Sequence, residues 1–132
     1  MIRRSIYVLL MKRKGEIPLA DCLFCKIIQG EIPSKAVYED AHTYAFLDIN
    51  PQAPTHVLVV SKAHVANIVE ASALEDDALA ACLRTAAKVA LLEGLEAGGF
   101  RVVTNCGEHA GQTVSHLHLH VLGGKPMNTT MA

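Results

Sequence analysis

The sequence predicts an α+β fold in which a five-stranded antiparallel sheet is covered by one long helix and a short N-terminal helix. Five short segments rich in β-branched or aliphatic residues are bounded by turn residues, and only residues 72–92 form an apolar stripe long enough for a helix of several turns. Short connections between consecutive strands favour antiparallel pairing. A single long helix covers only one face of such a sheet, so the other face is expected to border a cleft.

The first part of the chain is expected to form a short helix and a hairpin. Residues 21–28 begin with a capped turn and run into a helix that stops before Gly30. Residues 36–39 and 43–48 are rich in β-formers and are separated by three turn residues, which predicts two paired strands. The apolar, β-branched run at residues 55–60 predicts the third strand.

The long helix is predicted to begin at Ser72. Ser72 and Glu75 have the spacing of a capping box, and Asp76 and Asp77 place negative charge in the first turn, where the helix dipole favours it. Gly94 interrupts the pattern at the other end. The side chains expected to form an apolar stripe against the sheet are Leu74, Leu79, Cys82, Leu83, Ala86, Val89, Ala90 and Leu92.

Two further strands are predicted at residues 100–105 and 113–122. In the second of them His116, His118 and His120 alternate with aliphatic residues, so the three imidazoles should share one face of the strand. At roughly 3.4 Å per residue they lie within about 14 Å of one another. Packing does not require three ionisable groups in a row, so this strand is the candidate active site.

Two kinds of chemistry suit three aligned histidines. A neutral imidazole at the central His118 can attack phosphorus while its neighbours orient it or donate hydrogen bonds. The glycine-bearing loop at residues 107–113 adds backbone N–H groups, an amide and a hydroxyl, which favours phosphoryl or nucleotidyl transfer. Alternating imidazoles also form zinc or iron sites, so a metallohydrolase with His116, His118 and His120 as ligands remains an alternative.

Composition argues against polymers and membranes as partners. The formal net charge is −1 and the basic residues are dispersed, so the chain lacks the positive stripe that nucleic acid binding requires. The apolar run at residues 6–11 is too short to span a bilayer. Four cysteines without a convincing secretion signal favour reduced thiols and a cytoplasmic protein.

The 132 residues are expected to form one domain. The predicted domain covers residues 21–127. A flexible basic tail is expected before it at residues 1–20, and a C-terminal tail after it at residues 128–132.

Cys22 and Cys25 form a C-x-x-C motif. In a reduced compartment this motif suggests a zinc site or a redox pair. The alternative is two free thiols that pack inside the N-terminal helix.

Two segments of the chain resemble the histidine triad superfamily of nucleotide hydrolases and transferases. A-G-Q-T-V-S-H-L-H-L-H-V-L-G-G at residues 110–124 is similar to the signature strand and its approach loop, and F-L-D-I-N-P-Q-A-P-T-H at residues 46–56 is similar to the nucleoside-binding segment. The resemblance covers about residues 21–127, and V-L-G-G after the triad is similar to the Hint branch. It implies hydrolysis of purine nucleoside 5′-phosphoramidates through a covalent nucleotidyl-histidine intermediate, with no cofactor needed for catalysis.

The resemblance also implies a role for each site residue. His118 would be the nucleophile, His120 would hydrogen-bond the phosphate, and His56 with His116 would form a supporting imidazole relay. The other residues that it assigns to substrate or leaving group are Asp48, Ile49, Asn105, Gly111, Gln112, Thr113, Leu23, Phe24 and Ile28. Some members have a structural zinc, and the matching ligands would be Cys22, Cys25, His64 and His116.

Two other functions stay open beside the phosphoramidase. Thr113 stands where Hint proteins usually have serine, as in the Fhit branch that splits dinucleoside polyphosphates. A nucleotide-binding adaptor with incidental turnover is the second alternative. The resemblance further implies a homodimer formed through the long helix and an edge strand, for which residues 100–105 are the candidate.

Overall fold

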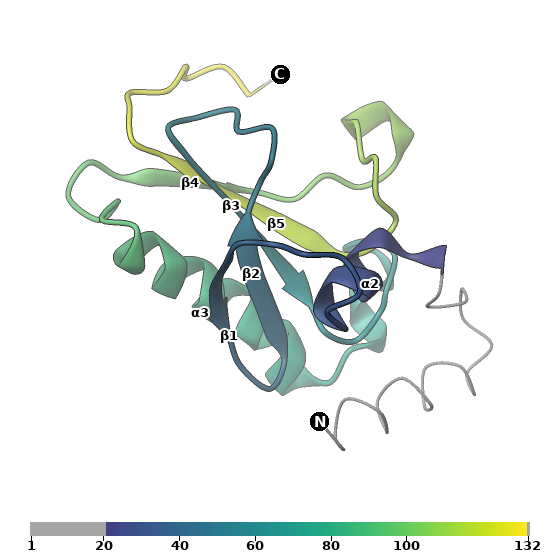
Figure 1. Cartoon of the computed structure of the whole chain (residues 1–132). Coiled ribbons are helices and arrows are strands. Elements are labelled where there is room, and N and C mark those ends of the chain that lie inside the picture. Colours follow the sequence, from purple (N-terminus) through teal and green to yellow (C-terminus); the bar gives the residue numbers. More distant parts are fainter. Residues whose placement is uncertain (1–20, 132) are drawn as a thin grey trace.

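The computed structural model describes residues 21–131 and contains one five-stranded antiparallel sheet (Figure 1). The strand order is β1-β2-β3-β5-β4, so β1 and β4 are the edge strands. The predicted fold class is therefore confirmed. The strands are β1 (Ala36–Glu39), β2 (Thr43–Leu47), β3 (Thr55–Ser61), β4 (Phe100–Val103) and β5 (His118–Gly123).

One face of the sheet packs against the long helix α3 (Asp76–Leu92). Val57 and Val59 of β3 and Leu119 and Val121 of β5 are buried in the same apolar cluster as side chains of α3. These residues alternate along their strands with residues of the opposite face. The prediction that the aliphatic residues between the histidines face the core is thus confirmed.

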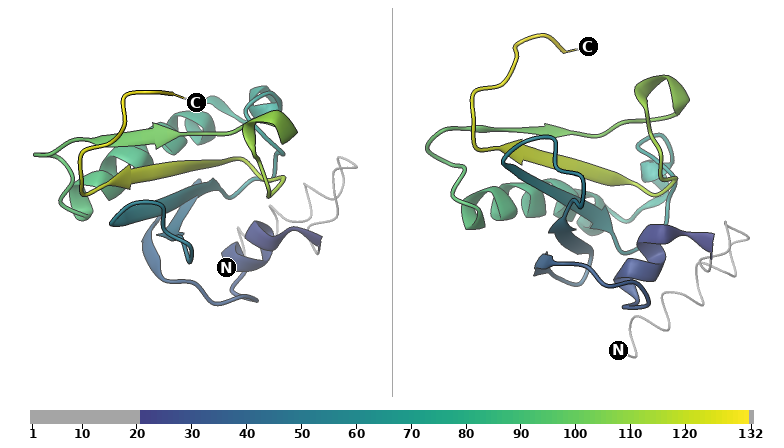
Figure 2. Two further views of the ribbon diagram at one scale, coloured as in Figure 1. Left: turned by 90° about the horizontal axis from the view of Figure 1, so that it is seen from above. Right: turned by 45° about the horizontal axis from the view of Figure 1, so that its top comes forward.

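The opposite face carries the histidines and is partly covered by the short helix α2 (Leu23–Ile28). Phe24 and Ile28 of α2 form a second buried cluster with Leu58 and Val60 of β3, whose side chains alternate with those beneath α3. Figure 2 gives two further views of this arrangement. The face was expected to be free, whereas α2 closes part of it because the short helix buries four of its six residues there.

The predicted capping box at Ser72 is wrong. Ser72 lies in a 3-10 helix, η2 (Glu70–Ala73), and α3 begins at Asp76 with Glu75 as an N-cap that makes no side-chain capping hydrogen bond. Leu74 between the two helices is extended, with ψ of 149°. Because Leu74 packs against both apolar clusters, its anchoring separates Ser72 from the helix that it was expected to cap.

The apolar stripe of α3 is only partly directed at the sheet. Leu79, Leu83 and Leu92 were expected to pack there but are 41%, 67% and 60% exposed. The buried side chains of α3 are Ala78, Ala81, Cys82, Thr85, Ala86, Val89 and Ala90. The helix therefore has two apolar sides, and the side made mostly of small residues is the buried one because it lets the helix lie close to the sheet.

The last strand is shorter than predicted and begins at His118 instead of Thr113. Its ladder with β3 ends at the pair Val60 and His118, because the chain turns away after Ser61 and offers no further partner. The N–H of Leu117 donates instead to the carbonyl of Val65 at 2.8 Å. His116 thus precedes the strand, although it stays on the side of α2.

Two other expectations concern the ends of the chain. The basic tail predicted at residues 1–20 lies outside the described residues. In the C-terminal segment the guanidinium of Arg101 donates to the carbonyl of Asn128 at 2.5 Å. None of the helices between residues 21 and 131 has the length and apolar character that crossing a bilayer requires.

Candidate active site

His118 is at the centre of the histidine face and is only 7% exposed. Its Nδ1 lies 2.6 Å from the main-chain carbonyl oxygen of His116. The ring of Phe24 meets the imidazole edge to face, with ring centroids 5.0 Å apart and an interplanar angle of 86°. The hydroxyl of Thr104 donates to the carbonyl of His118 at 2.7 Å, so backbone and ring are both held.

These contacts determine the tautomer of His118. A carbonyl oxygen can only accept a hydrogen bond, so Nδ1 must carry the proton. Nε2 of the neutral ring then has a free lone pair. Burial lowers the pKa of His118, partly offset by the hydrogen bond to His116, so the ring is neutral near pH 7. A neutral imidazole with a free Nε2 is in the form that acts as a nucleophile.

His120 and His56 form a second hydrogen-bonded unit beside it. The backbone N–H of Gln52 donates to Nδ1 of His56 at 3.0 Å, which leaves the His56 proton on Nε2. Nε2 of His56 lies 2.9 Å from Nδ1 of His120, which must therefore accept. The remaining proton of His120 is on its Nε2. The resemblance implied a relay between His56 and His116, but the structure pairs His56 with His120 because β3 places His56 beside β5 near its C-terminal end.

Both of these imidazoles are neutral in the folded protein. Burial lowers the pKa of His120 to about 4, with smaller contributions from the neighbouring His118 and His56. Burial also lowers the pKa of His56, although the carboxylate of Asp48 opposes this. That carboxylate lies 3.5 Å from Nε2 of His56, and the N–H of Asp48 donates to the His56 carbonyl at 3.0 Å. Asp48 is thereby fixed at the edge of the histidine face.

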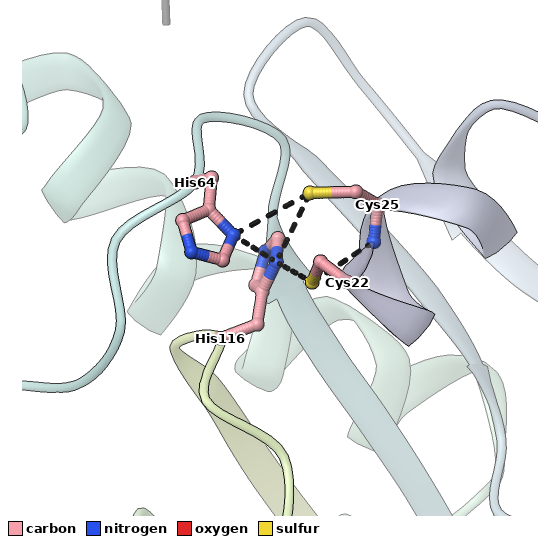
Figure 3. Close-up of side chains that lie close together, drawn as sticks. All are labelled: Cys22, Cys25, His64 and His116. Carbon is pink, nitrogen blue, oxygen red and sulfur yellow. Dashed lines mark hydrogen bonds between the residues drawn. The ribbon is translucent and has the colours of Figure 1, made fainter. Parts of the chain in front are cut away.

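The four predicted zinc ligands meet on the other side of His118 (Figure 3). We call Cys22, Cys25, His64 and His116 the four-ligand cluster. All four residues are buried, and their ligand atoms lie within 4.8 Å of one another. Cys22 and Cys25 come from the start of α2, His64 from the turn after β3, and His116 from the approach to β5.

The atoms of the four-ligand cluster have the spacing of a tetrahedral zinc shell. Zinc bonds of about 2.0–2.1 Å to nitrogen and 2.3 Å to sulfur put tetrahedral ligand atoms about 3.3–3.8 Å apart. Nδ1 of His116 lies 3.3 Å from Sγ of Cys22, 3.6 Å from Sγ of Cys25 and 3.1 Å from Nδ1 of His64. Sγ of Cys25 lies 3.4 Å from Nδ1 of His64. The donor set and its geometry therefore fit zinc.

The tautomer of His116 and the thiol of Cys22 also suit a metal. Nε2 of His116 lies 2.6 Å from the carbonyl of Ser61, so the proton is on Nε2 and the lone pair of Nδ1 faces the cluster. The hydrogen bond from Cys25, followed by those from His116 and His64, lowers the pKa of Cys22 although burial opposes the shift, whereas the hydrogen bond to Cys22 and burial raise the pKa of Cys25. A thiolate and a correctly oriented imidazole are both forms that ligate zinc.

The residues expected at the nucleoside differ in exposure. Leu23 and Ile49 are 44% and 92% exposed, so their side chains are open to a ligand. Phe24 and Ile28 are each 5% exposed and belong to the second apolar cluster. Phe24 therefore contributes mainly through its contact with His118.

The loop before β5 is held by Gln112. Its amide nitrogen lies 2.7 Å from the carbonyl of Ala66 and 3.0 Å from that of Val114, and its amide oxygen accepts from the N–H of Gly107. Gln112 was expected near the phosphate, whereas its polar atoms bond the loop itself. Gly111 has φ of 80°, which a side chain would strain, and Thr113 beside the loop is exposed. Asn105, after β4, is partly exposed.

Three residues of the site were not found from the sequence. Gln52 and Ser61 act through a backbone N–H and a carbonyl, which carry no side-chain signal. Thr104 acts through a hydroxyl on an adjacent chain segment, which becomes visible only when the strand order is known.

Comparison with known proteins gives a consistent set of relatives. Residues 29–127 match the model of the HIT domain. The chain is 42% identical to the purine nucleoside phosphoramidase of Escherichia coli K12 over 112 residues, which is 85% of this chain and 94% of that protein. A HIT family hydrolase from Clostridium thermocellum superposes with a TM-score of 0.79 at 45% identity, covering 85% of this chain and 97% of that one. A HIT family hydrolase from Legionella pneumophila superposes with a TM-score of 0.76 at 49% identity, covering 83% of this chain and 97% of that one.

Proposed function

Because this chain belongs to the HIT domain family, we propose that it is a nucleotide hydrolase that cleaves purine nucleoside 5′-phosphoramidates through a covalent intermediate on His118. The observation that carries the proposal is the tautomer of His118. Its Nδ1–H is bonded to a carbonyl and its Nε2 is free. The phosphoramidase from E. coli gives the substrate class.

The first chemical step requires a neutral nucleophile. Nε2 of His118 forms a bond to the α-phosphorus while the phosphorus–nitrogen bond to the leaving amine breaks. The amine keeps the electron pair of that bond and takes a proton, for which the exposed hydroxyl of Thr113 is the proposed donor because solvent can resupply it. Because the pKa of His118 is lowered and its proton is held on Nδ1, Nε2 is already unprotonated and needs no separate general base.

His120 is proposed to stabilise the phosphoryl oxygens. The chain from Gln52 through His56 leaves a proton on Nε2 of His120, so this atom can donate a hydrogen bond without a positive charge. Such a preorganised donor is worth most where charge develops in the transition state. In the second step a water oxygen bonds to phosphorus and the water gives up a proton to solvent. The bond to His118 breaks, its electron pair returns to Nε2, and the nucleoside monophosphate leaves.

The nucleoside is proposed to lie between Asp48 and α2. A carboxylate can accept hydrogen bonds from both ribose hydroxyls, and Asp48 is fixed beside His56. Leu23 and Ile49 offer exposed apolar surface for a purine base. The polar atoms of Gln112 are engaged in the loop, so its proposed contact with phosphate would require that loop to open.

The four-ligand cluster is proposed to bind a structural zinc. Bound there, the metal would supply folding energy and would not activate a catalytic water, because four protein ligands leave no position for water. The free thiols of Cys22 and Cys25 are in agreement with a reduced compartment, and we propose that the protein is cytoplasmic.

A homodimer is proposed through α3 and β4. Leu79 and Leu83 of α3 are exposed, and so are Phe100 and Val102 of the edge strand. Val102 pairs with Val121, whose side chain faces α3. The exposed side chains of β4 are therefore expected on the same side of the sheet as α3. A second copy would cover both the apolar surface and the free strand edge.

The test of the proposed function is a comparison of wild type with His118→Ala. The variant should lose turnover of adenosine 5′-phosphoramidate by several orders of magnitude and keep its affinity for adenosine monophosphate, because Asp48 and Leu23 are untouched. Wild type quenched during turnover of a substrate labelled at the α-phosphate should retain acid-labile, alkali-stable label on the protein. Absence of trapped label together with activity lost to a chelator would support the metallohydrolase instead. Faster turnover of a dinucleoside polyphosphate would move the protein to the other substrate class.

A further inference from the structure

His116 joins the four-ligand cluster directly to the candidate nucleophile. The ring of His116 is fully buried, with Nδ1 facing the cluster and Nε2 donating to the carbonyl of Ser61 at 2.6 Å. Its main-chain carbonyl accepts the Nδ1–H of His118, also at 2.6 Å. A movement of His116 therefore changes the acceptor that determines the His118 tautomer.

Phe24 forms a second connection between the same two places. It lies between Cys22 and Cys25 in the sequence, and its ring contacts the rings of His118 and His116 at centroid distances of 5.0 and 5.9 Å. Helix α2 has only six residues, which is too few for a helix to be stable without tertiary anchors. The two cysteines anchor its first turn, so they also determine where the Phe24 ring lies.

We propose that the four-ligand cluster, with zinc bound, is the positioning device that holds the His118 ring in its reactive orientation and tautomer. The inference rests on the proposed role of His118 and adds that Cys22, Cys25 and His64 act on catalysis without touching substrate. Loss of the metal would remove its bonds to His116 and to the two cysteines at the start of α2. The His118 ring can then turn or exchange its proton, which places hydrogen on the nitrogen that should attack.

The expected effect is a split between turnover and binding. A hydrogen bond of ordinary net strength changes the population of the bonded form by roughly tenfold. Turnover, kcat, should fall by about that factor when the cluster loses its metal. The affinity for adenosine monophosphate should change much less, because Asp48 is on the opposite side of His118.

Two variants of His64 separate a metal effect from a general packing effect. His64→Ala removes one ligand, whereas His64→Cys restores a four-ligand set of three cysteines and one histidine, which is common for structural zinc. His64→Cys should keep stoichiometric zinc, and His64→Ala should lose it. Cys82→Ser is the matched control, since Cys82 is a buried cysteine of α3 outside the four-ligand cluster, and should leave zinc content and kcat unchanged.

The decisive readout is the nitrogen NMR spectrum of ¹⁵N-histidine-labelled protein, assigned with His118→Ala. Wild type loaded with zinc and His64→Cys should show His118 with the proton on Nδ1 alone. Folded His64→Ala should show a mixture of tautomers at His118 and a kcat about tenfold lower. An unchanged His118 spectrum in zinc-free, folded His64→Ala would overturn the proposal.

A reciprocal measurement covers the case in which His64→Ala does not fold. Coupling between two sites acts in both directions, so removal of the His118 N–H should weaken zinc binding by about the factor by which zinc changes the population of the bonded His118 tautomer. Zinc affinity of wild type and His118→Ala is measured by competition with a chromophoric chelator. Equal affinities would overturn the coupling. If no covalent label is trapped in wild type while the tautomer still follows zinc, the proposed function fails and the positioning role stands.

Discussion

Acid should destabilise this protein partly through His120. In the folded state burial lowers the pKa of this imidazole to about 4, whereas in the unfolded chain the pKa returns to its ordinary value of 6.5. Between these two values the unfolded chain binds a proton that the folded protein does not. The free energy of unfolding therefore falls as pH falls through this window.

The magnitude follows from the two pKa values. A tenfold change in an equilibrium corresponds to about 1.4 kcal/mol, so a dry site would lose about 3 kcal/mol of stability between pH 7 and pH 4. The His120 side chain is only partly buried, and solvent screening reduces the expected loss to about 1–2 kcal/mol. This is still a large part of the stability of a small domain.

Urea unfolding of wild type and His120→Gln at several pH values between 7.5 and 4.5 measures this contribution. Glutamine keeps a polar side chain beside His56 but does not titrate. The stability of wild type relative to the variant should therefore decrease by about 1–2 kcal/mol as pH falls. The difference between the two proteins cancels the protonation of groups that do not contact His120. A difference that stays constant across this range would refute the assignment of a partly buried, neutral His120.

Three further outcomes are expected. Asp48→Asn should raise the KM of a ribonucleoside phosphoramidate by about tenfold, because the ribose offers hydroxyls to the carboxylate. The KM of the 2′,3′-dideoxy analogue, which has no such hydroxyls, should hardly change. Steady-state kinetics with both substrates checks this, and an equal rise in KM for both would exclude the ribose contact. Leu83→Glu should shift the protein from dimer to monomer in light scattering at micromolar concentration, since it places a charge on the exposed apolar side of α3. An unchanged molecular mass would show that this side of α3 is not the dimer interface. Thr104→Val should lower the free energy of unfolding by about 1 kcal/mol, because it removes the hydrogen bond to the His118 carbonyl. Urea unfolding measures this loss, with Thr130→Val as a control at an exposed threonine. Equal stability of the two variants would contradict the role of Thr104.

The sequence predicted the sheet well because alternation is a local property. Which side chains of residues 116–121 face the core follows from the period of two alone, and the structure agrees. The partner of His56 was predicted wrongly, because it depends on the register between β3 and β5. The capping box failed for a similar reason. Tertiary contacts of Leu74 decide where α3 begins, and the local spacing of Ser72 and Glu75 does not include them.

The inner side of α3 limits how the protein could be redesigned. A designer guided by hydrophobicity would enlarge the small residues of this helix to fill the core, and would replace its outer leucines with polar ones to improve solubility. Ala86 and Ala90 are 2% and 0% exposed against the sheet, so a leucine at either position would overpack the core and cost about 1–3 kcal/mol. Polar residues at Leu79 and Leu83 would in turn remove the surface on which a second copy is proposed to dock. The first change would therefore be expected to lower the stability of the fold, and the second to weaken the proposed dimer.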